Sequence, residues 1–167
     1  MLEAPSSSSS SHRIAIALGG NLGDPAASFK YAVTLLATGG VRDICKAPLF
    51  ITTPVDCVPG TPDFVNSALT ASWDGSPEEL LRLCQTIEQR LGRPAQHSSR
   101  ESRVIDLDIL LFDFLSLDSP NLIIPHPRLR LRRFVLEPLA QIAPDWPVPP
   151  DGQTVQQLLL QLTAPPS

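Results

Sequence analysis

Asp106 and Asp108 are separated by one residue within segment 104–112, which is otherwise apolar and rich in β-branched residues. Side chains in a β-strand alternate between two faces, so both carboxylates are expected on the same face. The other face would carry Ile105, Leu107, Ile109 and Leu111. Two neighbouring anions need a compensating cation, and hard oxygen ligands favour Mg²⁺. The pattern therefore predicts a magnesium site; the alternative is a half-exposed edge strand that carries two acids on its polar face.

The chain also gathers its cations near these acids. The net charge is −4 with 13 lysines and arginines. Most of the cations are arginines in one part of the chain, namely Arg90, Arg93, Arg100, Arg103, Arg128, Arg130, Arg132 and Arg133. Guanidinium groups bind phosphate in a bidentate manner, so arginines beside a magnesium site indicate a polyphosphate ligand. For residues 128–133 alone, a solvated basic loop is the alternative. The acidic net charge argues against a general nucleic-acid binder.

Length and composition indicate the class of protein. A chain of 167 residues with 43% hydrophobic residues fits one domain with a substantial core. Residues 1–12 contain a serine run and are expected to form a disordered tail, with a single domain over 13–167. No apolar stretch approaches the roughly 20 residues of a membrane helix, and no export signal is visible. The 3 cysteines fit no disulfide or zinc pattern, so we expect a cytoplasmic protein with free thiols.

Periodicity and capping residues predict the elements that must position these side chains. Strands are expected over 14–18, 41–51, 64–73, 104–112 and 122–124. Helices are expected over 25–38, 77–91, 134–142 and 154–162. The order β-α-β-β-α-β predicts a ferredoxin-like α+β fold, with an antiparallel sheet and additional C-terminal helices. In that fold the helices cover one face of the sheet, and the open face would be available to a ligand.

Phe64 and Asn66 repeat the spacing of the two acids on another predicted strand. Their ring and amide should therefore project together. A flat bicyclic ligand would stack on the ring, and the amide would offer its edge both a donor and an acceptor. The alternative is that Phe64 is a core residue and Asn66 a bulge or turn residue.

Four segments together resemble the 6-hydroxymethyl-7,8-dihydropterin pyrophosphokinases, a family of folate synthesis. They are Gly19-Gly20-Asn21-Leu22, Thr53-Pro54 with Pro62-Asp63-Phe64-Val65-Asn66, Arg103-Val104-Ile105-Asp106-Leu107-Asp108, and Pro125-His126-Pro127-Arg128 with Arg132-Arg133-Phe134-Val135-Leu136. The likeness spans about residues 14–145. It implies transfer of a pyrophosphoryl group from ATP to the hydroxymethyl oxygen of a reduced pterin, with AMP and the pterin diphosphate as products.

The resemblance also implies roles for individual residues. Asp106 and Asp108 would hold two Mg²⁺ ions that bridge the triphosphate, and Arg93 and Arg103 would join them in catalysis. The pterin would contact Thr53, Pro54, Phe64, Asn66 and Phe134. ATP would contact Gln85, Glu88, Arg100, Ile109, His126 and Arg132. The implied partners are these two small molecules, with no nucleic acid and no membrane, and the implied state is a monomer.

The chain departs from the family in a predicted lid. Arg100-Glu101-Ser102 stands where the family commonly has Trp-Gly-Pro, and Ala95 and Gln96 stand where it commonly has basic residues. A guanidinium can lie over an aromatic plane and also bind phosphate, so Arg100 would replace the tryptophan as the closing contact.

Two other functions fit parts of the sequence. One is a nucleotide-sugar transferase whose Asp-x-Asp pair holds a metal on a diphosphate, although the chain is small and lacks a parallel-sheet pattern. The other is a non-catalytic module that binds a small ligand and regulates a partner. Paired metal-binding carboxylates argue against the second.

Overall fold

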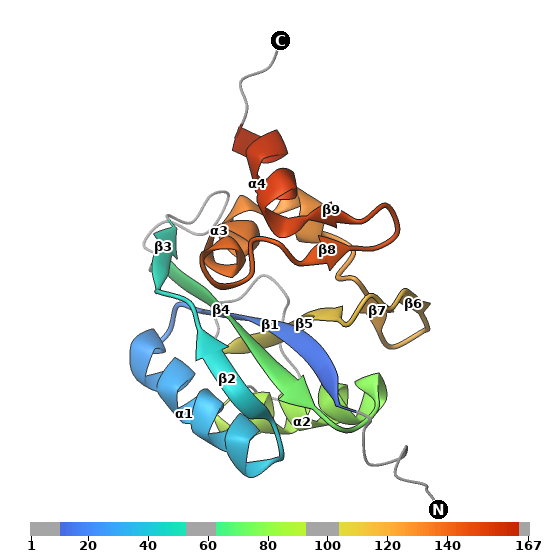
Figure 1. The fold of residues 1–167 in the computed structure, drawn as a ribbon. Helices are drawn as coiled ribbons and strands as arrows, with labels where there is room; N and C mark the ends of the chain where they lie inside the picture. The colour runs from blue at the N-terminus through green and yellow to red at the C-terminus, as the bar shows by residue number, and fades with distance from the viewer. Residues whose placement is uncertain (1–10, 53–62, 93–103, 164–167) are drawn as a thin grey trace, which may run out of the picture.

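The computed structural model describes residues 11–52, 63–92 and 104–163. An antiparallel sheet lies between two layers of helices, with α1 and α2 on one face and α3 and α4 on the other (Figure 1). The sheet has the order β2-β4-β1-β5, and β3 also pairs with β4. Its strands are β1 (His12–Gly20), β2 (Arg42–Lys46), β3 (Phe50–Thr52), β4 (Phe64–Trp73) and β5 (Asp106–Phe112).

The helices are α1 (Pro25–Thr38), α2 (Pro77–Arg90), α3 (Arg133–Ile142) and α4 (Val155–Thr163). Two short ribbons pair β6 (Leu117–Asp118) with β7 (Ile123–Ile124) and β8 (Pro147–Val148) with β9 (Gln153–Thr154), and a 3-10 turn, η2 (Leu129–Leu131), precedes α3. None of the described helices is long and apolar enough to cross a membrane. The prediction of a mixed α and β fold with an antiparallel sheet is confirmed.

The predicted starts of α1 and α2 are confirmed. The hydrogen bonds that cap these two helices join residues close together in sequence, which is why the sequence predicts them. The Asp24 carboxylate accepts a hydrogen bond from the Ala27 amide at 3.2 Å. At α2, the Ser76 hydroxyl accepts from the Glu79 amide at 3.1 Å, and the Glu79 carboxylate accepts from the Ser76 amide at 2.8 Å. These contacts satisfy amides that have no partner within the first helical turn.

The prediction of one strand over residues 41–51 is wrong. The chain forms β2 and β3 instead, separated by Ala47, Pro48 and Leu49. Proline has no amide hydrogen to donate to a strand ladder, so the chain leaves the sheet there. The Ser67 hydroxyl of β4 donates to the carbonyl oxygens of Ala47 at 3.0 Å and Pro48 at 3.2 Å, and thereby holds the break against the sheet.

Two hydrophobic cores lie on opposite faces of the sheet. The first core packs α1 and α2 against large residues of the central strands, including Ile14, Ile16, Leu69 and Ile109. The second packs α3 and α4 against small residues of the same strands, including Ala15, Ala17 and Ala68. The expectation of helices on one face only is therefore wrong: the apolar side chains of α3 and α4 need burial, and the second face of the sheet supplies it.

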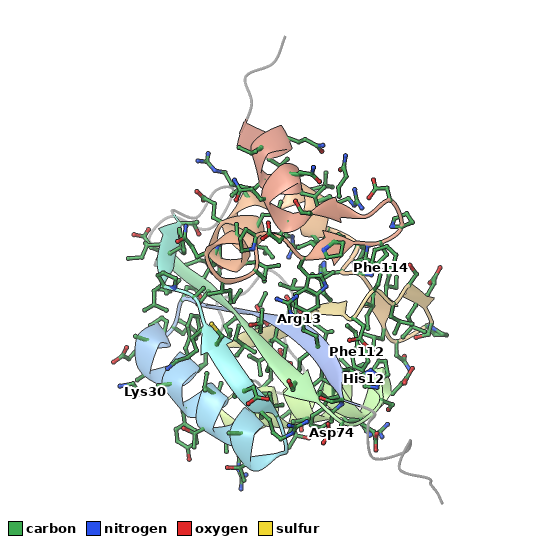
Figure 2. All side chains as sticks on the ribbon, viewed as in Figure 1. His12, Arg13, Lys30, Asp74, Phe112 and Phe114 are labelled. Carbon is green, nitrogen blue, oxygen red and sulfur yellow. The ribbon has the colours of Figure 1, made fainter. Side chains whose placement is uncertain are left out.

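Adjacent residues at the start of β1 show the two faces directly. The ring centroids of His12 and Phe112 lie 4.7 Å apart. The Arg13 guanidinium lies 4.0 Å from the centroid of the Trp146 ring, on the side of the second core (Figure 2). Strand alternation thus assigns neighbouring residues to different layers.

A bulge in β5 changes this alternation. Ala15 pairs with Leu111 and Ile16 with Ile109, so Leu110 is an extra residue in β5. The extra residue moves Leu111 to the second core and Phe112 to the first. The expectation that Leu111 shares a face with Leu107 and Ile109 is therefore wrong.

Candidate active site

The two acids of β5 lie opposite small residues of β1. Asp106 pairs with Gly19, and Asp108 pairs with Ala17. Both acids are half-buried, and their face of the sheet is the one that carries the second core, because Ala17 belongs to that core. The alternation that predicted a shared face for the two carboxylates holds here, since the bulge lies beyond them at Leu110.

An amide lies in the same cross-strand row as the first carboxylate. Gly19 pairs with Asp106 on one side and with Asn66 of β4 on the other. Side chains in directly paired positions project from the same face. A Cβ at Gly19 would lie 3.4 Å from Asn66 Oδ1. The glycine therefore leaves a gap between the amide and the carboxylate, and the amide oxygen borders that gap.

Strand β3 lies beside Asn66, at the end of this row of paired residues. Asn66 Nδ2 donates to the Thr52 hydroxyl at 3.1 Å. Phe50 pairs directly with Asn66, and Phe64 pairs with Thr52. Both rings are half-buried. Phe50 is not among the residues predicted from the sequence, because a single strand over 41–51 gives no break at Pro48, and the pairing of Phe50 depends on that break.

The outer edge of β5 is hydrogen-bonded to α2 and to the segment between β7 and η2. The Glu88 carboxylate of α2 is only 7% exposed and accepts from the Leu107 amide at 2.7 Å. The His126 amide donates to the Leu110 carbonyl oxygen at 3.0 Å. Leu107 is the residue between the two acids, so Glu88 fixes the backbone that carries them. Gln85, one turn earlier on α2, is exposed.

His126 is held in one tautomer. Its Nδ1 accepts a hydrogen bond from the Arg128 amide at 3.1 Å, so in the neutral ring the proton is on Nε2. Burial is the largest influence on the pKa of His126 and lowers it; Asp108 raises the pKa, whereas Arg132 and Arg128 lower it further. The imidazole is therefore neutral near pH 7, with Nε2–H available as a donor.

The arginines near His126 have different surroundings. The Arg132 guanidinium lies 5.6 Å from the centroid of the Phe134 ring. Arg133 pairs with Glu137 at 3.5 Å, and Arg130 pairs with Asp151 at 2.8 Å. Arg130 and Arg133 are thus paired with acids of the protein itself, and a polyphosphate site formed by the arginines stays a prediction.

Several predicted site residues lie outside the described residues, namely Thr53, Pro54, Arg93, Arg100 and Arg103. Within residues 11–52, 63–92 and 104–163, no group of three or more histidines, cysteines or acids is arranged to hold a metal ion. Asp106 and Asp108 nevertheless suit Mg²⁺, because they offer hard oxygen atoms from one face beside small neighbours, and Mg²⁺ commonly takes its remaining ligands from phosphates and water.

The chain is similar to proteins of one known family. The model of the 7,8-dihydro-6-hydroxymethylpterin-pyrophosphokinase (HPPK) family matches residues 15–144. The 2-amino-4-hydroxy-6-hydroxymethyldihydropteridine pyrophosphokinase of Synechocystis sp. is 34% identical over 151 residues, covering 90% of this chain and 76% of that protein. The protein of the same name in Methylorubrum extorquens is 37% identical over 154 residues, covering 90% and 93%.

A solved structure with a similar fold is the HPPK-DHPS protein of Plasmodium falciparum in complex with pteroate. It superposes with a TM-score of 0.69 at 14% identity and covers 90% of this chain. This chain spans only 42% of that protein. At this level of identity the similarity establishes the fold alone.

Proposed function

This chain belongs to the 7,8-dihydro-6-hydroxymethylpterin-pyrophosphokinase family, and on that premise we propose that its reaction takes place on the sheet face that carries Asn66, Asp106 and Asp108. The protein is a pyrophosphokinase of folate biosynthesis that transfers pyrophosphate from ATP to 6-hydroxymethyl-7,8-dihydropterin. The products are AMP and the pterin diphosphate. The observation that carries the assignment of the site is the cross-strand row Asn66–Gly19–Asp106.

Asp106 and Asp108 are the residues that would hold Mg²⁺, and we propose two ions. When bound, Mg²⁺ neutralises charge on the phosphates and helps to align the attacking hydroxyl group. The chain's own contribution is placement: β5 presents both carboxylates from one face, and Glu88 fixes the amide between them. Because phosphoryl transfer depends mainly on positioning and electrostatics, a rigid β5 is a requirement of this mechanism.

The pterin would occupy the gap above Gly19. The bond from Asn66 Nδ2 to Thr52 orients the amide, so Oδ1 would accept from an N–H at the amidine-like edge of the ligand. Phe64 and Phe134 would stack on its two faces, and Thr53 and Pro54 would extend the pocket. In this proposed pose the hydroxymethyl group would lie on the Asp106 side of Gly19, near the proposed metal ligands.

ATP would lie along the outer edge of β5. His126 would donate from Nε2–H to a phosphate oxygen, and Arg132 would bind another as a cation. The Leu107 amide points to the outer edge, and strand alternation therefore directs the backbone groups of Ile109 to the same edge, where an adenine base would find a donor and an acceptor. Gln85 would lie beside the nucleotide. Arg93 and Arg103 would act on the phosphates, and Arg100 would close the lid.

We also propose that the core is ferredoxin-like, with β3 as an addition. The element order β1-α1-β2-β4-α2-β5 and the strand order β2-β4-β1-β5 support this assignment. We further propose one domain over residues 13–167, acting as a monomer in the cytoplasm. Free thiols at Cys45 and Cys84 fit a reducing compartment.

Product analysis tests the proposed function. With ATP labelled at the β-phosphorus and reduced 6-hydroxymethylpterin, the label should move to the pterin, and unlabelled AMP should appear in equal amount. Stoichiometric ADP with a pterin monophosphate would contradict the proposal. Tight binding of both substrates without turnover would instead favour the non-catalytic module.

A further inference from the structure

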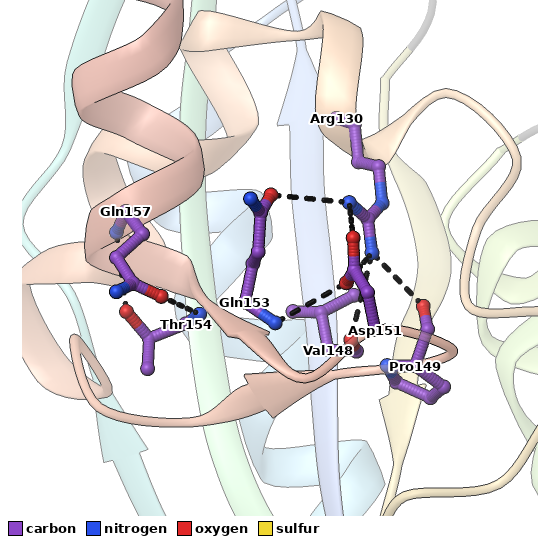
Figure 3. A network of polar contacts seen from close by, with 7 residues as sticks. All are labelled: Arg130, Val148, Pro149, Asp151, Gln153, Thr154 and Gln157. Atoms are coloured by element: carbon purple, nitrogen blue, oxygen red, sulfur yellow. Dashed lines mark hydrogen bonds and ion pairs between the residues drawn. The ribbon is translucent and has the colours of Figure 1, made fainter.

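The Arg130 side chain is hydrogen-bonded to the C-terminal ribbon, which consists of β8, β9 and the turn between them (Figure 3). Its Nη2 donates to Asp151 Oδ1 at 2.8 Å, to the Pro149 carbonyl oxygen at 3.1 Å and to the Val148 carbonyl oxygen at 3.5 Å. Its Nη1 donates to Asp151 Oδ2 at 3.2 Å and to Gln153 Oε1 at 3.5 Å. The guanidinium is thus engaged by the turn between β8 and β9.

The element that carries Arg130 separates two residues of the proposed ATP site. Its first residue, Leu129, donates its amide to the His126 carbonyl oxygen at 3.0 Å. The Arg132 amide donates to the Leu129 carbonyl oxygen at 3.4 Å. The Leu129 side chain is 1% exposed and lies in the second core. The position of η2 therefore determines how His126 and Arg132 are placed relative to each other.

We propose that Arg130 is a positioning residue for ATP binding: by binding Asp151 and the β8–β9 turn it holds η2, and through η2 it places His126 and Arg132. The inference rests on the proposed ATP contacts of these two residues. It makes the C-terminal ribbon part of the nucleotide site although the ribbon need not touch the nucleotide. Hydrogen bonds from Arg130 lower the pKa of Asp151, so the pair is ionised at neutral pH.

Arg130 could instead bind phosphate itself, and the two roles predict opposite effects for Asp151→Ala. If Arg130 acts through the ribbon, removing Asp151 should weaken ATP binding, but by less than removing Arg130, because the contacts of Arg130 with Val148, Pro149 and Gln153 remain. If Arg130 binds phosphate directly, removing Asp151 should release the guanidinium and leave ATP binding equal or tighter. Asp151 is half-exposed, so its replacement should leave the fold intact.

The experiment measures, by calorimetry, the Kd of a magnesium-bound non-hydrolysable ATP analogue, together with KM for both substrates and kcat. We expect Arg130→Ala to weaken analogue binding by about tenfold, Asp151→Ala to weaken it by about threefold or more, and the double variant to be no weaker than Arg130→Ala. Arg130→Lys should recover part of the loss. The KM for pterin should stay within about twofold, and the KM for ATP should rise more than kcat falls.

Arg42→Ala is the matched control. Arg42 binds Asp74 at 2.6 Å in an exposed ion pair, and it pairs with Ser72 near the end of β4 away from Asn66. Its removal should leave analogue affinity unchanged. Wild-type affinity in Asp151→Ala or Arg130→Ala, additive losses in the double variant, or an equal loss in Arg42→Ala would overturn the inference. Failure of the wild-type protein to bind the analogue would count against the proposed function itself.

Discussion

Small side chains around the two acids determine what Asp106 and Asp108 can do. Gly19 and Ala17 lie directly opposite them on β1, so a phosphate and its metal ions have room to approach the carboxylates. Neutral amides in place of the acids would keep the shape of the site and remove its charge. The proposed phosphoryl transfer depends there on the charge of the two side chains rather than on their shape.

Asp106→Asn and Asp108→Asn should each lower kcat by at least about a hundredfold, because each removes a charge that we propose to bind a metal ion. The fold should survive, since both side chains are half-buried on a face with small neighbours. Steady-state kinetics and thermal unfolding would measure the two effects, with Asp118→Asn, at an exposed acid of β6, as the control. Activity within about tenfold of wild type in a folded variant at either position would rule out its role as a metal ligand.

His126 should make stability depend on pH. Because burial lowers its pKa in the folded state, the unfolded chain binds more protons once the pH falls below the ordinary histidine value of about 6.5. The contribution of His126 to the free energy of unfolding is therefore complete above the ordinary histidine pKa. It is lost as the pH falls through the pKa that His126 has in the folded protein. Urea unfolding of wild type and His126→Gln over a pH series should show wild type losing more stability on acidification. Parallel curves would contradict the assigned environment of His126.

At the scale of elements, β5 shows what sequence patterns can and cannot predict. The shared face of Asp106 and Asp108 was predictable, because alternation is a local property of a strand. The bulge at Leu110 was not, since it depends on how β5 pairs with β1. Helix starts such as Ser76 were predictable because their capping contacts lie within one turn. The contact of Glu88 with Leu107 joins residues far apart in sequence, so the family resemblance could suggest only that Glu88 lies near the nucleotide.

Glu88→Ala should destabilise the protein by about 1–3 kcal/mol, because the buried Leu107 amide loses its acceptor. Glu88→Gln should cost less, since the side-chain oxygen remains. Urea unfolding would measure both, and Gln89→Ala, at an exposed position of the same helix, should have little effect. Equal stability of Glu88→Ala and wild type would mean that this contact does not hold the edge of β5.

At the scale of the whole molecule, the second face of the sheet is shared between packing and the proposed chemistry. The sequence predicted an open face, because the element order says nothing about where C-terminal helices dock. α3 and α4 instead pack on Ala15, Ala17 and Ala68, on the same face as Asn66 and the two acids. The helical pattern of 134–142 predicted α3 itself. Its docking face depends on contacts with strands distant in sequence, which periodicity does not report.

The two cores should unfold together, because β1, β4 and β5 contribute to both. The chain has 2 tryptophans, with Trp73 in the first core and Trp146 in the second. Trp73→Phe and Trp146→Phe would each leave one fluorescent reporter. In each variant, the fluorescence transition in urea should coincide with the transition of that same variant by far-UV circular dichroism.

The fluorescence and circular dichroism transitions are compared within each variant because each substitution itself changes the stability of the protein. Trp73 Nε1 donates to the Ser76 carbonyl oxygen at 3.0 Å, and Trp146 Nε1 donates to the Asp113 carbonyl oxygen at 3.2 Å, so each phenylalanine removes a hydrogen bond and shifts the midpoint. If Trp146 in the Trp73→Phe variant reports a transition at lower urea than circular dichroism does, the C-terminal layer unfolds separately. The proposal of one domain would then fail. The contacts of Arg130 in η2 with the C-terminal ribbon would then belong to a part of the protein that unfolds before the rest.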